Sequence, residues 1–425
     1  MKSTKAILTA LIILSPLLRR GAGGEAFGQG TWTQKSSLPA LGRLSAVSFI
    51  INDRAYLGTG TDNINTYFYD FWEYNPSIDS WTQKANFAGK TYYGAPPPLD
   101  TMGRRSASGF SIGAKGYICS GVGMTATSGG DTMFSDLWEY DSGANIWMQK
   151  TSVPFIGRMN SVSFSINGKG YIGTGVTGGF SGVPLDDLWE YDPIGDTWTQ
   201  KASLPGSARS EAVGFSMLGK GYIGTGRNST SLLNDFWEYN PSTNVWIQKA
   251  NLGNMTTARA GAAGFAIDST GRGYIGTGWN GSVYTWTFFK YDLLADTWTQ
   301  IIAFPGGVRA YARGFSIFLN GYFSCGTGSL PYNDLWEYTP SSVGIEENNF
   351  TSAISIYPNP SKGLLFIDRI EKGNIEIYNI AGQKISNQKI TSEKTQVDLS
   401  AQPSGIYFVR VSTEDKVYSQ KIVKD

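Results

Sequence analysis

Short apolar and aromatic runs, separated by polar turns, recur in a fixed order along most of the chain. One clear copy has four such runs, at 161–166, 170–173, 188–191 and 197–201. Asn167-Gly168, a strong hairpin signal, lies between the first two runs, and a turn containing Pro193 lies between the last two. The pattern therefore predicts four short antiparallel strands in each copy.

This group of runs is written six times, with a period of roughly 50 residues. Each copy contains an element similar to Tyr-Ile-Gly-Thr-Gly, opened by Tyr56, Tyr117, Tyr171, Tyr222, Tyr274 and Tyr322. Glycine and aromatic residues at this period are typical of propeller blades. From 32 to 338 the chain resembles the kelch-repeat, galactose oxidase-like propeller family, which implies an all-β fold with a six-bladed β-propeller.

The first and last copies are incomplete in complementary ways. The stretch 31–35 has the pattern of a fourth strand with no blade before it, and the last copy stops at 336–338 without its own fourth strand. We expect 31–35 to complete the sixth blade, because joining the two ends in this way leaves no open sheet edge. The propeller domain is then predicted to span 29–340.

Tryptophan residues recur at fixed places in the third and fourth runs. We interpret them as packing between blades, because the same residue at the same place in each copy is what a repeated scaffold requires. The fifth copy departs from the pattern, since Phe289-Lys290-Tyr291 replaces Trp-Glu-Tyr. An aromatic residue still fills the position, so we expect the packing to survive.

The amino-acid composition excludes several kinds of catalytic and metal-binding site. Among 425 residues, Lys+Arg 35 and Asp+Glu 34 give a net charge of +1, which does not support nucleic acid as a partner. Histidine is absent, which excludes a Ser-His-Asp triad, a histidine-ligated zinc site and histidine-bound copper. We predict no metal site and no cofactor. The two cysteines, Cys119 and Cys325, are interpreted as small buried apolar residues rather than as a disulfide.

Residues 1–28 have the pattern of a secretory signal peptide. Lys2 and Lys5 precede an apolar run over 6–18, and 26–28 offers small residues for cleavage. Arg19 and Arg20, directly after the apolar run, are unusual in such a signal. The run is too short to span a membrane as a helix, and no other stretch is long and apolar enough, so no transmembrane segment is predicted.

The composition changes after residue 340. A polar linker is predicted over 341–351, and from 352 to 425 β runs alternate with Asn-Pro, Ala-Gly and Pro-Ser-Gly turns, which predicts a small β-sandwich. The spaced motifs are Tyr357-Pro358-Asn359-Pro360 with Gly363, Tyr378-Asn379 with Gly382-Gln383, Gly405-Ile406-Tyr407 and the terminal Lys421-Ile422-Val423-Lys424.

This tail closely resembles the C-terminal sorting domain of the type IX secretion system. The resemblance implies a Gram-negative envelope and the secretion machinery as a partner. It also implies a protein that is secreted or attached to the outer-membrane surface, with the tail removed during release or attachment.

Antiparallel geometry sorts the loops of the predicted propeller onto two faces. The segments between blades and the loops joining second and third strands share one face, face A, whereas the hairpins share the other, face B. Face A loops vary in length, and variable loops on a repeated scaffold commonly carry function. Their aromatic residues are predicted to contact a ligand: Tyr67, Tyr92, Phe134, Phe180, Trp279, Tyr284 and Trp286.

An arginine precedes the first strand of every copy: Arg43, Arg104, Arg158, Arg209, Arg259 and Arg309. The six could form an anion-binding mouth on face A, since guanidinium groups pair well with carboxylates. We favour a structural role, in which each ties its blade to a neighbour through a repeated aspartate such as Asp70. Two residues further on the copies differ, and this set is the better candidate for specificity: Ser45, Ser106, Asn160, Glu211, Gly261 and Tyr311.

Three functions remain open. The first is a secreted or cell-surface binding module that recognises a glycan or a protein through face A. The second is an enzyme similar to the six-bladed kelch mutarotases that act on sialic acid, with Glu211 as the acid-base group and Arg209 or Arg259 as a carboxylate anchor. The third is a structural component of a surface layer or biofilm. The missing catalytic set favours the first.

Overall fold

The computed structural model describes residues 30–64, 66–89, 103–124, 131–179, 182–341, 355–368, 370, 372–379, 384–413 and 417–425. The predicted signal peptide and nearly all of the predicted linker lie outside these residues. The described part consists of β-strands, with two single-turn 3-10 helices at Met255–Thr257 and Asp268–Thr270. The prediction of an all-β chain with a six-bladed propeller is confirmed.

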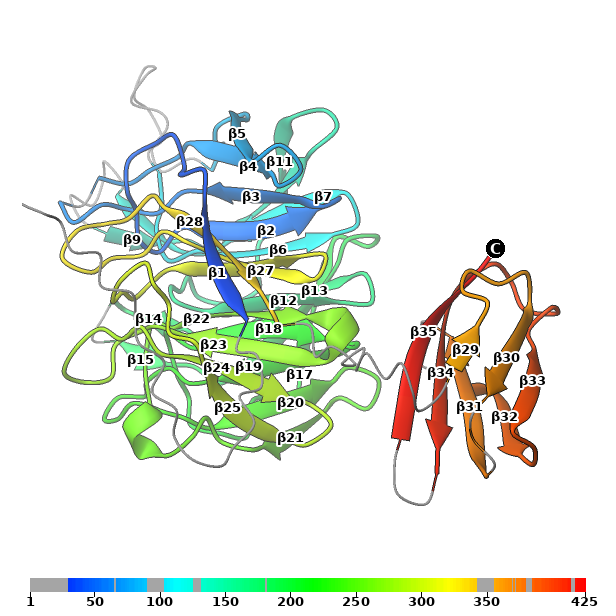
Figure 1. Ribbon diagram of the computed structural model, residues 1–425. Helices are drawn as coiled ribbons and strands as arrows, with labels where there is room; N and C mark the ends of the chain where they lie inside the picture. The colour runs from blue at the N-terminus through cyan, green and yellow to red at the C-terminus, as the bar shows by residue number, and fades with distance from the viewer. Residues whose placement is uncertain are drawn as a thin grey trace, which may run out of the picture.

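Six four-stranded antiparallel sheets surround a common axis and form the blades (Figure 1). The first contains β2 (Val47–Ile51), β3 (Arg54–Gly58), β4 (Phe71–Asn75) and β5 (Ser80–Gln83). The second contains β6 (Ser108–Ile112), β7 (Lys115–Cys119), β10 (Leu137–Asp141) and β11 (Ile146–Lys150). The third contains β12 (Val162–Ile166), β13 (Lys169–Gly173), β16 (Leu188–Asp192) and β17 (Thr197–Lys201).

The fourth blade contains β18 (Val213–Met217), β19 (Lys220–Gly224), β20 (Phe236–Asn240) and β21 (Val245–Lys249). The fifth contains β22 (Ala263–Ile267), β23 (Arg272–Gly276), β24 (Phe288–Asp292) and β25 (Thr297–Ile301). Two short ribbons extend the face A loops: β8 (Val122–Met124) with β9 (Asp131–Met133), and β14 (Val176–Thr177) with β15 (Val183–Pro184).

The sixth blade is built from both ends of the propeller. It contains β26 (Arg313–Ile317), β27 (Asn320–Ser324) and β28 (Leu335–Thr339), and its outer strand is β1 (Thr31–Lys35). The register pairs Thr31 with Thr339 and Lys35 with Leu335. The N-terminal strand therefore closes the ring, which is the arrangement that the incomplete first and last repeats require.

Close packing between blades explains one of the repeated glycines. A Cβ on Gly170 of the third blade would lie only 2.1 Å from the ring of Phe110, on the inner strand of the second blade. Gly221 meets Phe164 in the same way, with 2.4 Å to the nearest ring atom. The phenylalanine of one blade thus packs onto the bare backbone of the next, where no larger residue has room.

The C-terminal region contains two antiparallel sheets. One contains β29 (Ser355–Tyr357), β30 (Leu364–Asp368) and β33 (Lys394–Asp398), and the other contains β31 (Gly373–Asn379), β32 (Lys384–Ile390), β34 (Gly405–Ser412) and β35 (Val417–Lys424). Buried side chains from both sheets, including Leu365, Ile377 and Val409, form one core. The region is therefore a β-sandwich with its own core.

Candidate functional site at the propeller mouth

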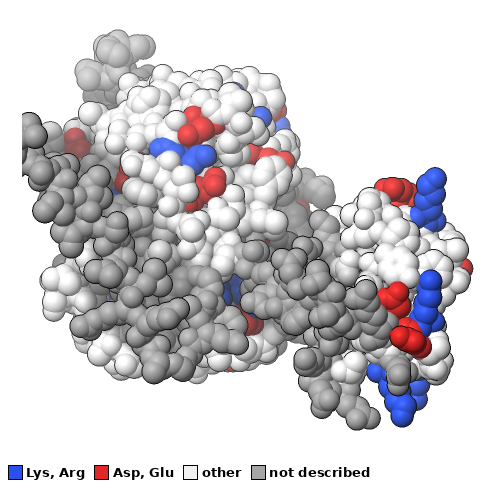
Figure 2. Space-filling model, in the orientation of Figure 1, with Lys and Arg blue, Asp and Glu red and all other residues white. Residues whose placement is uncertain are grey.

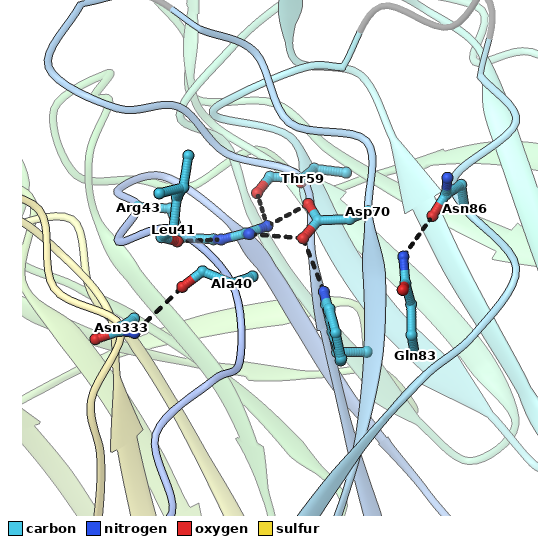
Figure 3. A network of polar contacts seen from close by, with 9 residues as sticks. Ala40, Leu41, Arg43, Thr59, Asp70, Gln83, Asn86 and Asn333 are labelled. Carbon is cyan, nitrogen blue, oxygen red and sulfur yellow. Dashed lines mark hydrogen bonds and ion pairs between the residues drawn. The ribbon is translucent and has the colours of Figure 1, made fainter.

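The repeated arginines lie inside the blades. Arg43 is fully buried, and its two terminal nitrogens each donate to one oxygen of Asp70 at 2.7 Å (Figure 3). The same guanidinium group donates to the carbonyl of Thr59, and Trp72 donates its indole N–H to Asp70. The arrangement recurs for Arg104 with Asp136, Arg158 with Asp187, Arg209 with Asp235 and Arg309 with Asp334.

These five arginines serve the scaffold, because burial and bidentate pairing leave their guanidinium groups no room for a ligand. Our expectation that the aspartate belongs to a neighbouring blade is wrong, since each pair lies within one blade. The link between blades comes from the arginine backbone instead. The amide of Gly60 in the first blade donates to the carbonyl of Arg104 in the second at 2.7 Å, and Gly326 donates in the same way to Arg43 across the ring closure.

Arg259 of the fifth blade is the exception. Thr287 stands where the other blades carry aspartate, and its hydroxyl accepts from Nη2 of Arg259 at 3.2 Å. The side chain also donates to the carbonyls of Thr257 and Thr277. Its hydrogen bonds are therefore satisfied, but no carboxylate of the described residues neutralises it, and burial lowers its pKa to about 10.

The non-repeating positions form a closed ring of backbone hydrogen bonds around the axis, which we call the hub ring. Each amide donates to the carbonyl of the equivalent residue in the preceding blade, with N–O distances of 2.8–3.1 Å. All six residues adopt the left-handed conformation, with φ between 53° and 60°. The members are Ser45, Ser106, Asn160, Glu211, Gly261 and Tyr311. The backbone of the ring is thus fixed, whereas its side chains are free to differ.

Three side chains, two from the fourth blade and one from the sixth, meet on one side of the hub ring. The Tyr311 hydroxyl donates to Oε2 of Glu211 at 3.0 Å, and Nη2 of Arg227 lies 2.9 Å from Oε1. Glu211 is 6% exposed, and each oxygen of its carboxylate contacts one of these two partners. Burial raises the pKa of Glu211, and the Arg227 charge and the Tyr311 hydrogen bond offset this only in part. We call these three residues the mouth cluster.

The composition of the hub ring makes the mouth cluster possible. A Cβ on Gly261, between Glu211 and Tyr311 in the ring, would lie 2.9 Å from the Tyr311 ring. Glycine at this position therefore lets Tyr311 reach across the fifth blade to Glu211. The other half of the ring carries the small polar residues Ser45, Ser106 and Asn160, so the charged and aromatic members of the hub ring lie on one side of it.

The aromatic candidates of the face A loops divide into two groups. Trp286 is 54% exposed and Trp279 is half-buried beside Tyr284, so both can contact a ligand. Tyr67 is largely buried, and its hydroxyl donates to Asp131 at 2.5 Å, where Arg105 also pairs at 2.9 Å. Phe134 stacks on Arg104. The prediction of ligand contact is therefore not supported for Tyr67 and Phe134, and Tyr92 and Phe180 lie outside the described residues.

Arg227 was missed by sequence reasoning, although a signal for it exists. It directly follows the Gly-Thr-Gly element of the fourth copy, where the other copies carry Thr61, Val122, Val176, Trp279 and Thr327. Each of these residues pairs with the residue that precedes a hub-ring position. Comparing the copies at this position would have shown a second non-repeating set beside the mouth.

Other features fit the predicted scaffold. Cys119 and Cys325 are buried and not disulfide-bonded, as predicted, and burial raises the pKa of the Cys119 thiol to about 12.

Within the described ranges, no group of acidic or cysteine residues is arranged to hold a metal, and no helix has the length and apolarity to cross a membrane. On the side of the propeller seen in Figure 2, charged side chains lie close to others of opposite sign.

Comparisons with known proteins agree with this architecture. A family model described as "Secretion system C-terminal sorting domain" matches residues 355–425, and one described as "Kelch motif" matches 176–205. A solved structure described as "Structure of YjhT" has a TM-score of 0.60 and 17% identity, and the match covers 72% of this chain and 97% of that chain. No curated protein sequence matches. At this identity the structural likeness shows the fold alone.

Proposed function

We propose that this protein, a kelch-type propeller followed by a secretion-system C-terminal sorting domain, is a secreted or surface-displayed module that binds a glycan at the face A mouth. The mouth cluster carries the proposal, because it brings a buried carboxylate, a tyrosine hydroxyl and a partly exposed guanidinium group together at positions where the blades differ. Converging polar groups of this kind are what orients a polar ligand in a binding site.

The surroundings of Glu211 suit a carbohydrate. Sugar hydroxyls can donate to its carboxylate and accept from Arg227, whose side chain is 34% exposed. The exposed ring of Trp286 and the half-buried ring of Trp279 offer flat apolar surfaces of the kind that stack on sugars. The sorting domain supports a place outside the cell or on the outer membrane, where glycans of other cells are accessible.

The test is binding of the full chain to a broad glycan array, followed by titration of any ligand found. We expect Glu211→Gln to weaken binding by roughly 10- to 100-fold, since a hydrogen bond to a charged group contributes about 1.5–3 kcal/mol. Asp53→Asn, in the face B hairpin between β2 and β3, removes the same charge far from the mouth and should leave affinity unchanged. Equal affinity for Glu211→Gln would refute the site.

A second candidate is proton transfer on the bound sugar. The raised pKa of Glu211 favours it, because a carboxyl group that titrates closer to neutral pH can both give and take a proton. Arg209 cannot act as the expected carboxylate anchor, because Asp235 occupies its guanidinium group, and Arg259 is buried. Arg227 is the cation beside Glu211. Sugar anomerisation followed by NMR would test this role, and an unchanged rate in Glu211→Gln would exclude it.

A further inference from the structure

The inner strands of the six blades enclose a channel along the propeller axis. Its face A end is a cavity of about 130 Å³ lined by small residues from β2, β6, β12, β18, β22 and β26. Arg313, at the start of β26, is the one charged side chain among the lining residues. The other blades carry Val47, Ser108, Val162, Val213 and Ala263 at the same place, so the blade itself does not require an arginine.

Arg313 is half-buried and, like Arg259, lacks the carboxylate partner that the other five repeated arginines have. Its Nε donates to the carbonyl of Ala46 in the first blade, and among the described residues no carboxylate pairs with it. Burial lowers its pKa to about 10, so it remains charged at neutral pH. Its half-buried side chain lines the channel, where no carboxylate of the described residues neutralises it and a small ligand can reach it.

The hydroxyl groups along the channel point to one further donor. Ser163 donates to the carbonyl of Gly109, and Ser108 and Ser161 bond to each other. The side-chain hydroxyl of Ser48 makes no hydrogen bond within the described residues. Ser48 lies two residues after Ala46, which Arg313 contacts. One guanidinium group and one free hydroxyl, with no acidic side chain lining the cavity, form a site of net positive charge.

We propose that the channel binds a small, singly charged anion, a halide or a short carboxylate, against Arg313 and Ser48. The cavity has room for such an anion and a few waters, since each water takes about 30 Å³. A single positive group matches a single negative charge. The anion neutralises the hub of the propeller, and this site is independent of the proposed glycan site.

The thermal midpoint of the full chain, read by tryptophan fluorescence, tests the site. Chloride, bromide or formate should raise the midpoint by about 2–4 °C at ten times the dissociation constant, relative to gluconate at equal ionic strength, which is too large to enter. Arg313→Val, which copies three other blades, should fold and lose this difference. Ser48→Ala should reduce the anion affinity several-fold.

A bromide soak of wild-type crystals gives the direct readout. We expect an anomalous peak beside the Arg313 guanidinium group in the wild type and none in Arg313→Val. The proposal is overturned if Arg313→Val keeps the full anion dependence, or if no bromide occupies the channel. Glu211→Gln should retain the anion effect, so failure of the glycan site leaves this result interpretable.

Discussion

At the scale of single residues, the blades contain a natural comparison of buried arginines with and without a carboxylate. Asp235→Asn leaves Arg209 buried without its counter-charge, and we expect it to cost about 3 kcal/mol of unfolding free energy. Thr287→Asp gives Arg259 the carboxylate that its blade lacks, and we expect a gain of about 1.5 kcal/mol. Denaturant unfolding followed by tryptophan fluorescence reports the propeller alone, since all 13 tryptophans precede residue 340.

Asp53→Asn is the matched control for this pair, because it removes a carboxylate from a face B turn that asparagine also tolerates at positive φ. Its unfolding midpoint should equal that of the wild type. If Thr287→Asp lowers the midpoint while Asp235→Asn leaves it unchanged, the buried pairs do not stabilise the blades.

Glu211 should also make stability depend on pH. Its pKa is raised in the folded protein by burial, so between the unfolded value near 4.5 and the raised value the folded state binds more protons. Stability contributed by this group is therefore lost as the pH rises through that window. Glutamine does not titrate, so the Glu211→Gln variant does not lose stability in this way. In thermal melts from pH 4 to 8, the thermal midpoint of the variant minus that of the wild type should therefore increase with pH. A constant difference would contradict the raised pKa.

Three of the repeated aspartates, Asp70, Asp136 and Asp235, act in the opposite direction, because their pKa is lowered in the folded protein. Burial alone would raise the pKa of Asp235, but the hydrogen bonds and charge of Arg209, with the Trp237 indole, lower it overall. Its stabilisation is present above the unfolded pKa and lost as the pH falls through the folded value. The wild type and the Glu211→Gln variant share this loss of stability at low pH. Comparing the two proteins at each pH therefore cancels it.

At the scale of elements, repetition decided what the sequence could predict. Six copies of one strand pattern specify the blade. The pairing of 31–35 with β28 could also be predicted, because the last copy has no fourth strand of its own to pair with β28. The mouth cluster was only half predictable. Glu211 and Tyr311 differ from their counterparts, but their contact depends on Gly261 between them, and Arg227 reaches them from a loop. The contact of Tyr311 with Glu211 spans the fifth blade, so it leaves no local pattern in the sequence.

The closing strand offers an element-scale prediction. Trp32 on β1 packs at 5.0 Å between ring centroids against Phe288, Phe304 and Tyr338, so it joins the fifth and sixth blades. Trp32→Ala should cost about 3 kcal/mol in denaturant unfolding. Trp81, at the same place on β5, has Tyr74 as its ring contact. Trp81→Ala should cost less, and an equal or larger loss there would show that the closing strand has no special role.

At the scale of the whole molecule, the sorting domain is held together by its own last residues. The amide of Val423 donates to Asn359 at 2.9 Å, and the amide of Ser361 donates to the Val423 carbonyl at 2.8 Å. Ile422 is fully buried in the sandwich core. The Pro-Asn-Pro segment and strand β35 therefore form one unit, so the sandwich needs residues 417–424 for its fold.

This arrangement predicts separate outcomes for export and for propeller folding. In a bacterium with a type IX secretion system, deletion of 355–425 should leave the protein inside the envelope, as should Ile422→Asp, because an unpaired charge in the core disrupts the sandwich. The tryptophan-detected melt of the propeller should be unchanged in both variants, because the two cores share no cluster. Fractionation of cells and medium measures export, with Lys389→Gln, at an exposed position of β32 outside the sorting motifs, as the control. Release of the truncated chain at wild-type levels would show that the tail does not direct secretion.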